Sequence, residues 1–407
     1  ECSEQTFSRY YANSIASHIA NSSPKIKRVF DSWKQSGDAL VSNLEKNQEL
    51  KNLLLEETPW VLQAQDETER KKRVGLLFDL NNMSRQLETA KRKLQQMQLA
   101  SGAWPWFTDM RANRYLTQHI VAGFGHLDKL EVTSDNETRS MAQRAIQYMD
   151  EEMHQDYRRM LENEVDMKKN HLNSLVIHYM YARSYFMNYP VRNDHQEAFN
   201  YWKSQAQQYW VDLGQVYREG MIALALHRLG DKKIPADIIA SLKERALHSE
   251  EMGMYWRSET GYFWYQAPIE TQALLIELFD EVANDRQAVN DMRIWLLKQK
   301  QTQDWKTTKA TVEACYALLL RGTDWLADDR IVEVSLGGEK VDIAAKDDTK
   351  PEAGTGYFKT AWTGGDIKQE MGNVSVTKQT EGVAWGGLYW QYFEDLDNIT
   401  PHETPLK

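Results

Sequence analysis

The chain has 407 residues, of which 42% are hydrophobic, 27% charged and 11% aromatic. This composition indicates a globular protein rather than a disordered one, large enough for two or three domains. No apolar run approaches the ~18 residues of a membrane span, and a net charge of −10 argues against a nucleic-acid partner. The two cysteines, Cys2 and Cys315, are too few for a disulfide framework.

The chain begins ECSEQTFSRYYANS, with no initiator methionine, basic start or apolar signal core. We therefore expect a segment of a larger protein, cut just ahead of a reactive group.

From about Thr6 to Leu326 the apolar residues recur at the three- and four-residue spacing of helices. The first helix is expected to end at Asn21-Ser-Ser-Pro24. Further helices are predicted at 25–36, 39–56, 68–99, 112–130, 136–163, 169–188, 194–209, 213–229, 235–249, 267–283, 285–300 and 308–321.

A weak internal repeat underlies this helical region. The stretches 98–127, 261–282 and 300–320 each contain a turn with Trp, then Thr or Glu near a helix start, then an apolar helix with small residues. The Trp is suited to fill the gap between neighbouring helices, and Thr or Ser to cap free N–H groups. Repeated hairpins of this kind predict a mainly α fold, an α/α toroid, which we favour over a linear solenoid because the copies are irregular.

After Asp328-Asp329 the sequence changes character. RIVEVSLGG and EKVDIAA alternate apolar with polar residues around Gly337-Gly338, which predicts a β-hairpin. GTGYFKTAW, GNVSVTKQ and VAWGGLYWQYF are expected to be further strands of a partial β-sandwich. We expect a toroid domain over 1–329, a partial β-sandwich segment over 330–396 and a linker over 397–407.

Cys2 and Gln5 stand three residues apart at the start of the first helix, on one face and within reach of each other. A thiol beside a carboxamide can form an internal thioester with loss of ammonia where water is excluded. This acyl group can then be attacked by a lysine amine or a sugar hydroxyl. On the C-x-x-Q spacing alone, a capped or buried cysteine near a polar glutamine remains the alternative.

The fuller string Cys2-Ser3-Glu4-Gln5 resembles the C-x-E-Q thioester motif of the α2-macroglobulin and complement family. The following TFSRYYA is similar to the bacterial branch, SGAWPWF…NRYLTQHIVAGFGHL resembles the family's G-x-W…T-x-x-(V/I) stretch, and W…TTKATVEACYALL resembles the last helical hairpin of its thioester domain. The resemblance covers about 1–326, and GVAWGGLYWQYFEDLD is similar to the strands that follow in large Bacteroides-like members. It implies that the β-segment over 330–396 is CUB-like or macroglobulin-like. Ser3 departs from the pattern, because the family more often has Gly or Leu there.

The resemblance implies a bacterial protease inhibitor rather than a turnover enzyme. A protease cuts a bait region elsewhere, and the exposed thioester then acylates a lysine of that protease. Cys2 would carry the acyl group, Gln5 would supply it and Glu4 would orient the loop. The resemblance implies no cofactor and no metal, target proteases and neighbouring macroglobulin domains as partners, and a periplasmic or cell-surface location with a lipid anchor supplied elsewhere.

Three other interpretations compete with a protease inhibitor. A carbohydrate-binding or carbohydrate-active toroid could stack sugars on Trp104, Trp106, Trp256, Trp264 and Trp305, although core positions are more common for tryptophan. An inert interaction module could retain CSEQ as a relic. A terpene cyclase or prenyltransferase is disfavoured, because the adjacent Asp pairs 328–329 and 347–348 do not extend to D-x-D-D or D-D-x-x-D.

The remaining candidate residues are expected to have structural roles. His119 and His126 are seven residues apart, as are His171 and His178, which is on the order of 10 Å along a helix and too far for one shared metal. All four are expected as polar positions on half-buried helix faces. The acid run 150–152 is expected on a solvated helix face, and Cys315 as a small core residue.

Overall fold

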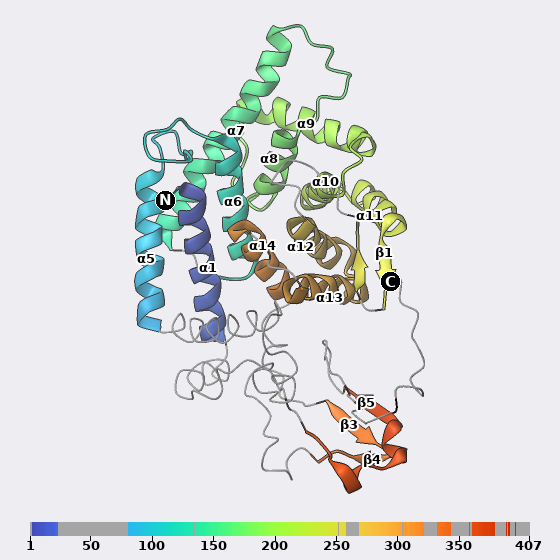
Figure 1. The fold of residues 1–407 in the computed structure, drawn as a ribbon. Coiled ribbons are helices and arrows are strands. Elements are labelled where there is room, and N and C mark those ends of the chain that lie inside the picture. Colours follow the sequence, from blue (N-terminus) through green and yellow to red (C-terminus); the bar gives the residue numbers. More distant parts are fainter. Residues whose placement is uncertain are drawn as a thin grey trace.

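The computed structural model describes residues 2–22, 80–132, 135–250, 252–257, 268–302, 305, 307–320, 332–342, 358, 360–378, 388, 390 and 395 (Figure 1). The described chain is mainly helical, as predicted, and contains two small sheets. The helices expected at 25–36 and 39–56, and the first part of 68–99, lie outside the described residues.

The described helices follow the predicted order. They are α1 (Ser3–Ser22), α5 (Leu80–Met97), α6 (Arg114–Lys129), α7 (Asn136–Glu162), α8 (Ser174–Ser184), α9 (Gln196–Tyr209), α10 (Val216–Arg228), α11 (Lys233–Arg245), α12 (Pro268–Leu278), α13 (Arg286–Thr302) and α14 (Thr308–Leu319). Short turns adjoin two of them: η2 (Asn193–His195) and η3 (Trp210–Asp212) lie at the two ends of α9, and a π-turn η5 (Phe279–Ala283) follows α12. The 3.6-residue spacing therefore predicted the helices' existence well, and their ends within a few residues.

The packing of the helices runs in a closed circuit. Helix α6 packs on α8, α8 on α10, α10 on α12, α12 on α14, α14 on α1, and α1 on α6. Helix α5 packs beside α1, and α13 packs beside α12 (Figure 1). Helix α7 packs on α6, and α9 and α11 pack on α10. We call α1, α6, α8, α10, α12 and α14 the ring helices.

Small residues on α6 allow its neighbours to approach closely. A Cβ added at Gly123 would lie 2.4 Å from Cζ of Phe7 on α1, and one at Gly125 would lie 2.3 Å from Cγ of Tyr185 at the end of α8. Both glycines are in the apolar stretch HIVAGFGHL. Their missing side chains therefore set the distance between α6 and the two ring helices beside it.

Two tryptophans of the repeat, Trp104 and Trp305, fill gaps between helices, as expected, and Trp256, which lies ahead of the stretch 261–282, does the same. Trp104, Trp256 and Trp305 are buried, and each indole N–H donates to a carbonyl of the preceding helix. The acceptors are the carbonyl oxygens of Leu94 at 2.9 Å, Leu242 at 2.9 Å and Leu296 at 3.3 Å, respectively. Each indole thus bonds the C-terminal half of the helix that precedes it, which is α5, α11 or α13. Trp264 lies outside the described residues.

The helix caps agree only in part with the expected Thr or Glu. Thr307 caps α14, where its hydroxyl accepts from the Ala310 N–H at 3.0 Å. At α6 the cap is Asn113, whose carboxamide oxygen accepts from Leu116 N–H at 2.9 Å. Thr117, which lies near the same helix start, instead accepts a hydrogen bond from the Trp104 backbone N–H at 2.9 Å through its hydroxyl.

The prediction of helix over 235–249 was wrong at its end. Residues 247–249 form strand β1 (Leu247–Ser249), which pairs antiparallel with β2 (Gly253–Tyr255). The backbone becomes extended at Ala246 (ψ 143°), and Gly253 has a φ of +70° in close contact with the Asp291 carbonyl. The cause is this tertiary contact of the hairpin with α13, which helical spacing alone does not reveal.

The hairpin predicted around Gly337-Gly338 is confirmed. Strand β3 (Glu333–Leu336) pairs with β4 (Glu339–Lys340) through two glycines with φ of +61° and +83°, the values that a tight two-residue turn requires. The expected strand at 372–379 is β5 (Val374–Thr377), antiparallel to β3. The described part of GTGYFKTAW, residues 358 and 360–362, is not a strand, so that prediction was wrong there.

Most of VAWGGLYWQYF lies outside the described residues. The β-sandwich and the domain boundaries stay predictions.

Candidate functional site

Cys2 and Gln5 form a reciprocal cap at the start of α1. Cys2 immediately precedes the helix, and its Sγ accepts a hydrogen bond from the Gln5 backbone N–H at 3.4 Å. In return, Oε1 of Gln5 accepts from the Cys2 backbone N–H at 3.4 Å. This is the geometry of a capping box in which a thiol replaces the usual hydroxyl. The structure therefore brings the two predicted residues together.

The cap is anchored to the loop before α6. The Ser3 N–H donates to the Trp106 carbonyl at 2.9 Å, and the Thr6 hydroxyl donates to the Cys2 carbonyl at 3.0 Å. In Figure 1 the N-terminal end of α1, marked N, lies beside the loop that joins α5 to α6. Ser3 is buried, and its hydroxyl lies 3.8 Å from Sδ of Met97. The start of α1 is thus held by both α5 and the α5–α6 loop.

The two members of the pair differ in exposure. Cys2 is only 8% exposed, whereas the Gln5 side chain is exposed. The Gln5 carboxamide therefore lies where a nucleophile from solvent can reach it, next to a sulfur that is largely covered.

Glu4 connects this site to the last ring helix. Its Oε1 accepts from the Ser8 hydroxyl at 2.9 Å and from the Thr308 hydroxyl at 3.1 Å. Its Oε2 lies 4.0 Å from Sγ of Cys2. Thr308 is the first residue of α14, so one carboxylate joins the beginning and the end of the helical region.

The expectation of half-buried histidines was wrong for three of the four. His119, His126 and His178 are buried, and His171 is half-buried. Burial lowers the pKa of His178 to about 3 and also lowers that of His119, with the charge of Lys309 adding to both effects. These imidazoles are therefore neutral, because the circuit of helices encloses them more fully than the spacing on one helix suggests.

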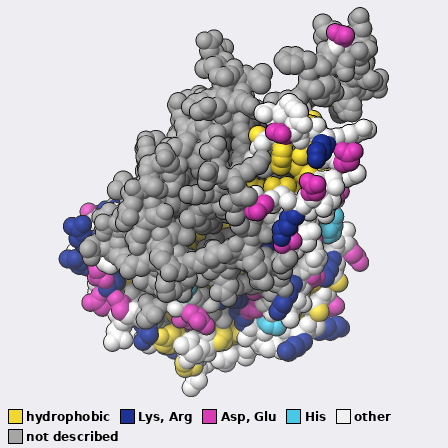
Figure 2. All heavy atoms as spheres, turned by 90° about the horizontal axis from the view of Figure 1, so that it is seen from below, with side chains coloured by type: hydrophobic (Ala, Val, Ile, Leu, Met, Phe, Trp, Pro, Cys, Tyr) yellow, Lys and Arg dark blue, Asp and Glu magenta, His cyan; other side chains and the backbone are white. Residues whose placement is uncertain are grey.

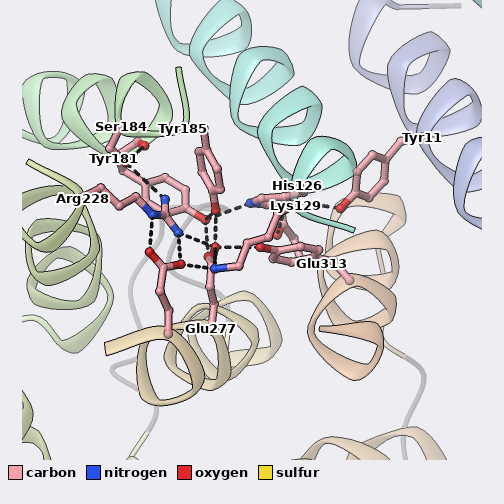
Figure 3. A network of polar contacts seen from close by, with 11 residues as sticks. Tyr11, His126, Lys129, Tyr181, Ser184, Tyr185, Arg228, Glu277 and Glu313 are labelled. Atoms are coloured by element: carbon pink, nitrogen blue, oxygen red, sulfur yellow. Dashed lines mark hydrogen bonds and ion pairs between the residues drawn. The ribbon is translucent and has the colours of Figure 1, made fainter. Parts of the chain in front are cut away.

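A second group of polar residues, which we call the central network, joins all six ring helices (Figure 3). Its members are Tyr11 on α1, His126 and Lys129 on α6, Tyr181 on α8 with Tyr185 just beyond it, Arg228 on α10, Glu277 on α12 with Glu281 just beyond it, and Glu313 and Tyr316 on α14.

Glu277 is the hub of the central network. Its carboxylate accepts from the hydroxyls of Tyr181 at 2.8 Å, Tyr316 at 2.7 Å and Tyr185, and from Arg228 Nη2 at 2.7 Å. Burial alone would raise the pKa of Glu277, but Arg228 and Lys129 hold it well below its usual range. Glu277 is thus a buried carboxylate with full hydrogen-bond compensation.

His126 links the hub to α1 and α14. Its Nε2 lies 2.8 Å from the Tyr181 hydroxyl and its Nδ1 lies 3.2 Å from the Tyr11 hydroxyl. Burial lowers the pKa of His126 to about 3, against an opposing effect of Glu277. Burial also raises the pKa of Glu313, 3.6 Å from His126 Nδ1, to about 7, although Lys309 opposes this.

The acidic and basic members of the central network were not predicted from the sequence. The signal was present: Glu277 interrupts the apolar run ALLIELF, and Arg228 follows IALALH. A charged residue within an apolar helical run predicts a buried, paired charge.

The acid run 150–152 also departs from its prediction. Asp150 is buried, where its Oδ1 accepts from Arg183 Nε at 2.9 Å and from the Tyr179 hydroxyl at 2.7 Å. Glu151 and Glu152 are half-buried. Cys315 is partly buried and packs against the hydrophobic core, as expected, and burial raises the pKa of its thiol to about 11.

The residues on which the rival functions depend lie as follows. Trp104, Trp256 and Trp305 are core residues, and Trp106 is half-buried. The Asp pairs 328–329 and 347–348 lie outside the described residues. Among the residues that the structure describes, no group of three or more His, Cys, Asp and Glu side chains is arranged to hold a metal ion.

The surface and the helices have two further general features. Figure 2 shows acidic and basic side chains interspersed over the described part of the face that it draws. Within the described ranges, no helix has the length and apolar character needed to cross a membrane.

Comparison with solved structures finds bacterial alpha-2-macroglobulins among the neighbours. The structure of Salmonella alpha-2-macroglobulin reacted with methylamine is similar with a TM-score of 0.41 and 15% identity, over 81% of this chain and 18% of that one. Native Escherichia coli alpha-2-macroglobulin, from domain MG7 to the C-terminus, is similar with a TM-score of 0.40 and 14% identity, over 64% of this chain and 38% of that one. This chain thus spans less than half the length of either neighbour. No protein-family model and no curated protein matches it.

Proposed function

We propose that this chain is the thioester-bearing part of an α2-macroglobulin-like protease trap. The observation that carries the proposal is the reciprocal contact of Cys2 and Gln5, whose thiol and carboxamide are the two groups that an internal thioester requires. The C-S-E-Q string that surrounds them supplies the resemblance to that family. In this account Cys2 carries the acyl group, Gln5 provides it, and neither a cofactor nor a metal takes part.

We further propose that the ring helices form the inner layer of an α/α toroid. The closed circuit of contacts from α1 through α6 to α14 and back to α1 supports this arrangement. So does the central network, to which every ring helix contributes a side chain. The toroid would fix the two ends of the helical region against each other and so hold the start of α1 in place.

The chemistry of the trap is a single acyl transfer. A lysine amine of the bound protease attacks the thioester carbonyl of Gln5, an amide forms, the C–S bond breaks and the Cys2 thiol is released. Each molecule reacts once, so the protein inhibits without turnover. The exposed Gln5 side chain is accessible to such an amine, and shielding before activation would require neighbouring macroglobulin domains. A periplasmic or cell-surface location, with a lipid anchor, belongs to the same proposal.

One alternative rests on the same observation. A capping box stabilises a helix whether or not a thioester forms, so Cys2 and Gln5 could serve α1 alone in an inert interaction module. The sugar-binding alternative has less support, because three of the five candidate tryptophans are core residues with their indole N–H groups bonded to backbone carbonyls.

Covalent capture tests the proposed function. The full-length gene product is incubated with trypsin and then denatured with its disulfides reduced. We expect a trypsin-containing band that survives denaturation, and its loss in both C2A and Q5A. The Cys315→Ala variant serves as the matched control, because it removes the other thiol and should leave the band unchanged. A band that persists in C2A would contradict the proposal.

A further inference from the structure

Glu4 is placed to move protons at the Cys2–Gln5 pair. Its Oε2 is 4.0 Å from Sγ of Cys2, and the side chain is half-buried. Among the side chains that the structure describes, the Glu4 carboxylate is the one that contacts the Cys2 sulfur. A carboxylate at this range is a candidate general base, since catalytic hydrogen bonds are often long before the reacting complex forms.

Two hydroxyls hold the other oxygen of Glu4. Ser8, one turn along α1, donates to Oε1 at 2.9 Å, and Thr308 at the start of α14 donates to the same oxygen at 3.1 Å. With Oε1 fixed in this way, Oε2 is directed toward the sulfur. The contact of Thr308 crosses 304 positions of sequence, so it exists only when α14 is packed against α1.

From this geometry we infer that Glu4 is the proton acceptor and donor of the thioester reaction, and that Thr308 is the residue that positions it. The inference rests on the proposed function and deepens it, because it assigns a role beyond orienting the loop. It also makes the chemistry depend on the closure of the helical circuit, since only the docked α14 supplies the Thr308 hydroxyl.

The formation step balances without any other reactant. Glu4 takes the proton of the Cys2 thiol, and Sγ attacks the carboxamide carbon of Gln5. The C–N bond then breaks, and the nitrogen takes the proton back from Glu4 and leaves as ammonia. In the trapping step an amine loses its proton to Glu4, the C–S bond breaks, and the Cys2 sulfur recovers that proton. General acid–base assistance of this kind contributes about 10²- to 10⁴-fold in rate.

The test measures, in the full-length gene product, the fraction of chains that are one ammonia lighter and the rate of methylamine uptake. Wild-type, E4Q, T308V and T308S proteins are compared, with T311V as the matched control. Thr311 lies one turn along α14 and is exposed, and its hydroxyl donates to the Thr307 carbonyl at 3.0 Å, its side-chain bond among the described residues. Melting temperatures report whether each variant is folded.

We expect E4Q to lower the uptake rate or the fraction of light chains about 10²-fold or more. T308V should lower them several-fold, whereas T308S, which keeps the hydroxyl, and T311V should behave as wild type. In the E4Q background T308V should have no additional effect, because it acts through Glu4. A folded E4Q protein with wild-type values, or an undiminished effect of T308V in E4Q, would overturn the inference. A wild-type protein with no ammonia loss and no uptake would instead overturn the proposed function, and the inference with it.

Discussion

The imidazole of His126 lies flat against the ring of Tyr316, with the two centroids 3.9 Å apart and the planes inclined by 8°. This stack joins α6 to α14, and through the Tyr316 hydroxyl it reaches Glu277 on α12. The packing of the ring helices therefore depends on a hydrogen-bonded polar centre as well as on apolar side chains. A buried polar network is stabilising only while every member is satisfied.

Loss of the hub charge is the first prediction. We expect E277Q to destabilise the chain by about 2–3 kcal/mol, because the buried Arg228 would lose one of its two carboxylate partners and retain only Glu281. The double variant R228M/E277Q should recover part of that loss. Urea denaturation measures both. The control is E162Q, which breaks the exposed pair of Arg158 and Glu162 and should change the free energy of unfolding by less than about 1 kcal/mol. An E277Q effect as small as that of E162Q would contradict the network.

The second prediction concerns pH and Glu313. Its pKa is about 7 in the folded chain and 4.5 ordinarily, so between these pH values the folded chain retains a proton that the unfolded chain has released. Stability therefore falls as pH rises through this window, by at most about 1.4 kcal/mol per pH unit. E313Q removes this dependence.

We expect the stability of E313Q minus that of wild type to rise from pH 4.5 to pH 7 and to level off outside that range. The lowered pKa values of His126 and His178 act in the opposite direction below pH 6.5, but both proteins contain these histidines and the difference cancels their contribution. Thermal or urea denaturation over this pH range is the measurement. A difference independent of pH would show that Glu313 is ionised throughout.

The third prediction separates the two thiols. Because the pKa of Cys315 is about 11, only about one thiol in a thousand is thiolate at pH 8. After methylamine treatment, iodoacetamide should therefore label Cys2 at least about ten times faster than Cys315, as measured by peptide mapping. C2A should lose the fast phase and C315A should retain it. A fast phase that survives in C2A would contradict the assignment.

The fourth prediction tests the close approach of α1 and α6. A methyl group at Gly123 would overlap the Phe7 ring, so G123A should destabilise the chain by about 1–3 kcal/mol. Shortening the opposing side chain with F7L should relieve part of the effect in the double variant. The control is G365A, where nothing lies within 4 Å of the added Cβ, and its melting temperature should equal that of wild type. Equal melting temperatures for G123A and wild type would contradict the packing.

The helical region was predictable because its signal is local. Apolar spacing located α6, α7, α9 and α14, and the repeated Trp in the turn predicted the core indoles of Trp104 and Trp305. The failures have tertiary causes. The end of α11 gives way to the β1–β2 hairpin because Gly253 packs against α13, and no spacing on α11 reveals that contact.

The candidate site was predictable in part for the same reason. The C-x-x-Q spacing placed Cys2 and Gln5 on one face of α1, and local geometry brings them into contact. The contact of Glu4 with Thr308 joins residues 304 positions apart and could not be predicted without the fold. The central network was missed because its members are spread over six helices and meet only in three dimensions.

Intact mass of the full-length gene product, before and after methylamine, tests the thioester most directly. We predict a mass one ammonia below that of the unmodified sequence, a gain of one methylamine at Gln5 on treatment, and a Cys2 thiol that becomes titratable at the same time. C2A should have the unmodified mass and take up no methylamine. A wild-type protein with a free Cys2 thiol, the unmodified mass and no uptake would contradict the account and leave Cys2 and Gln5 as a helix cap.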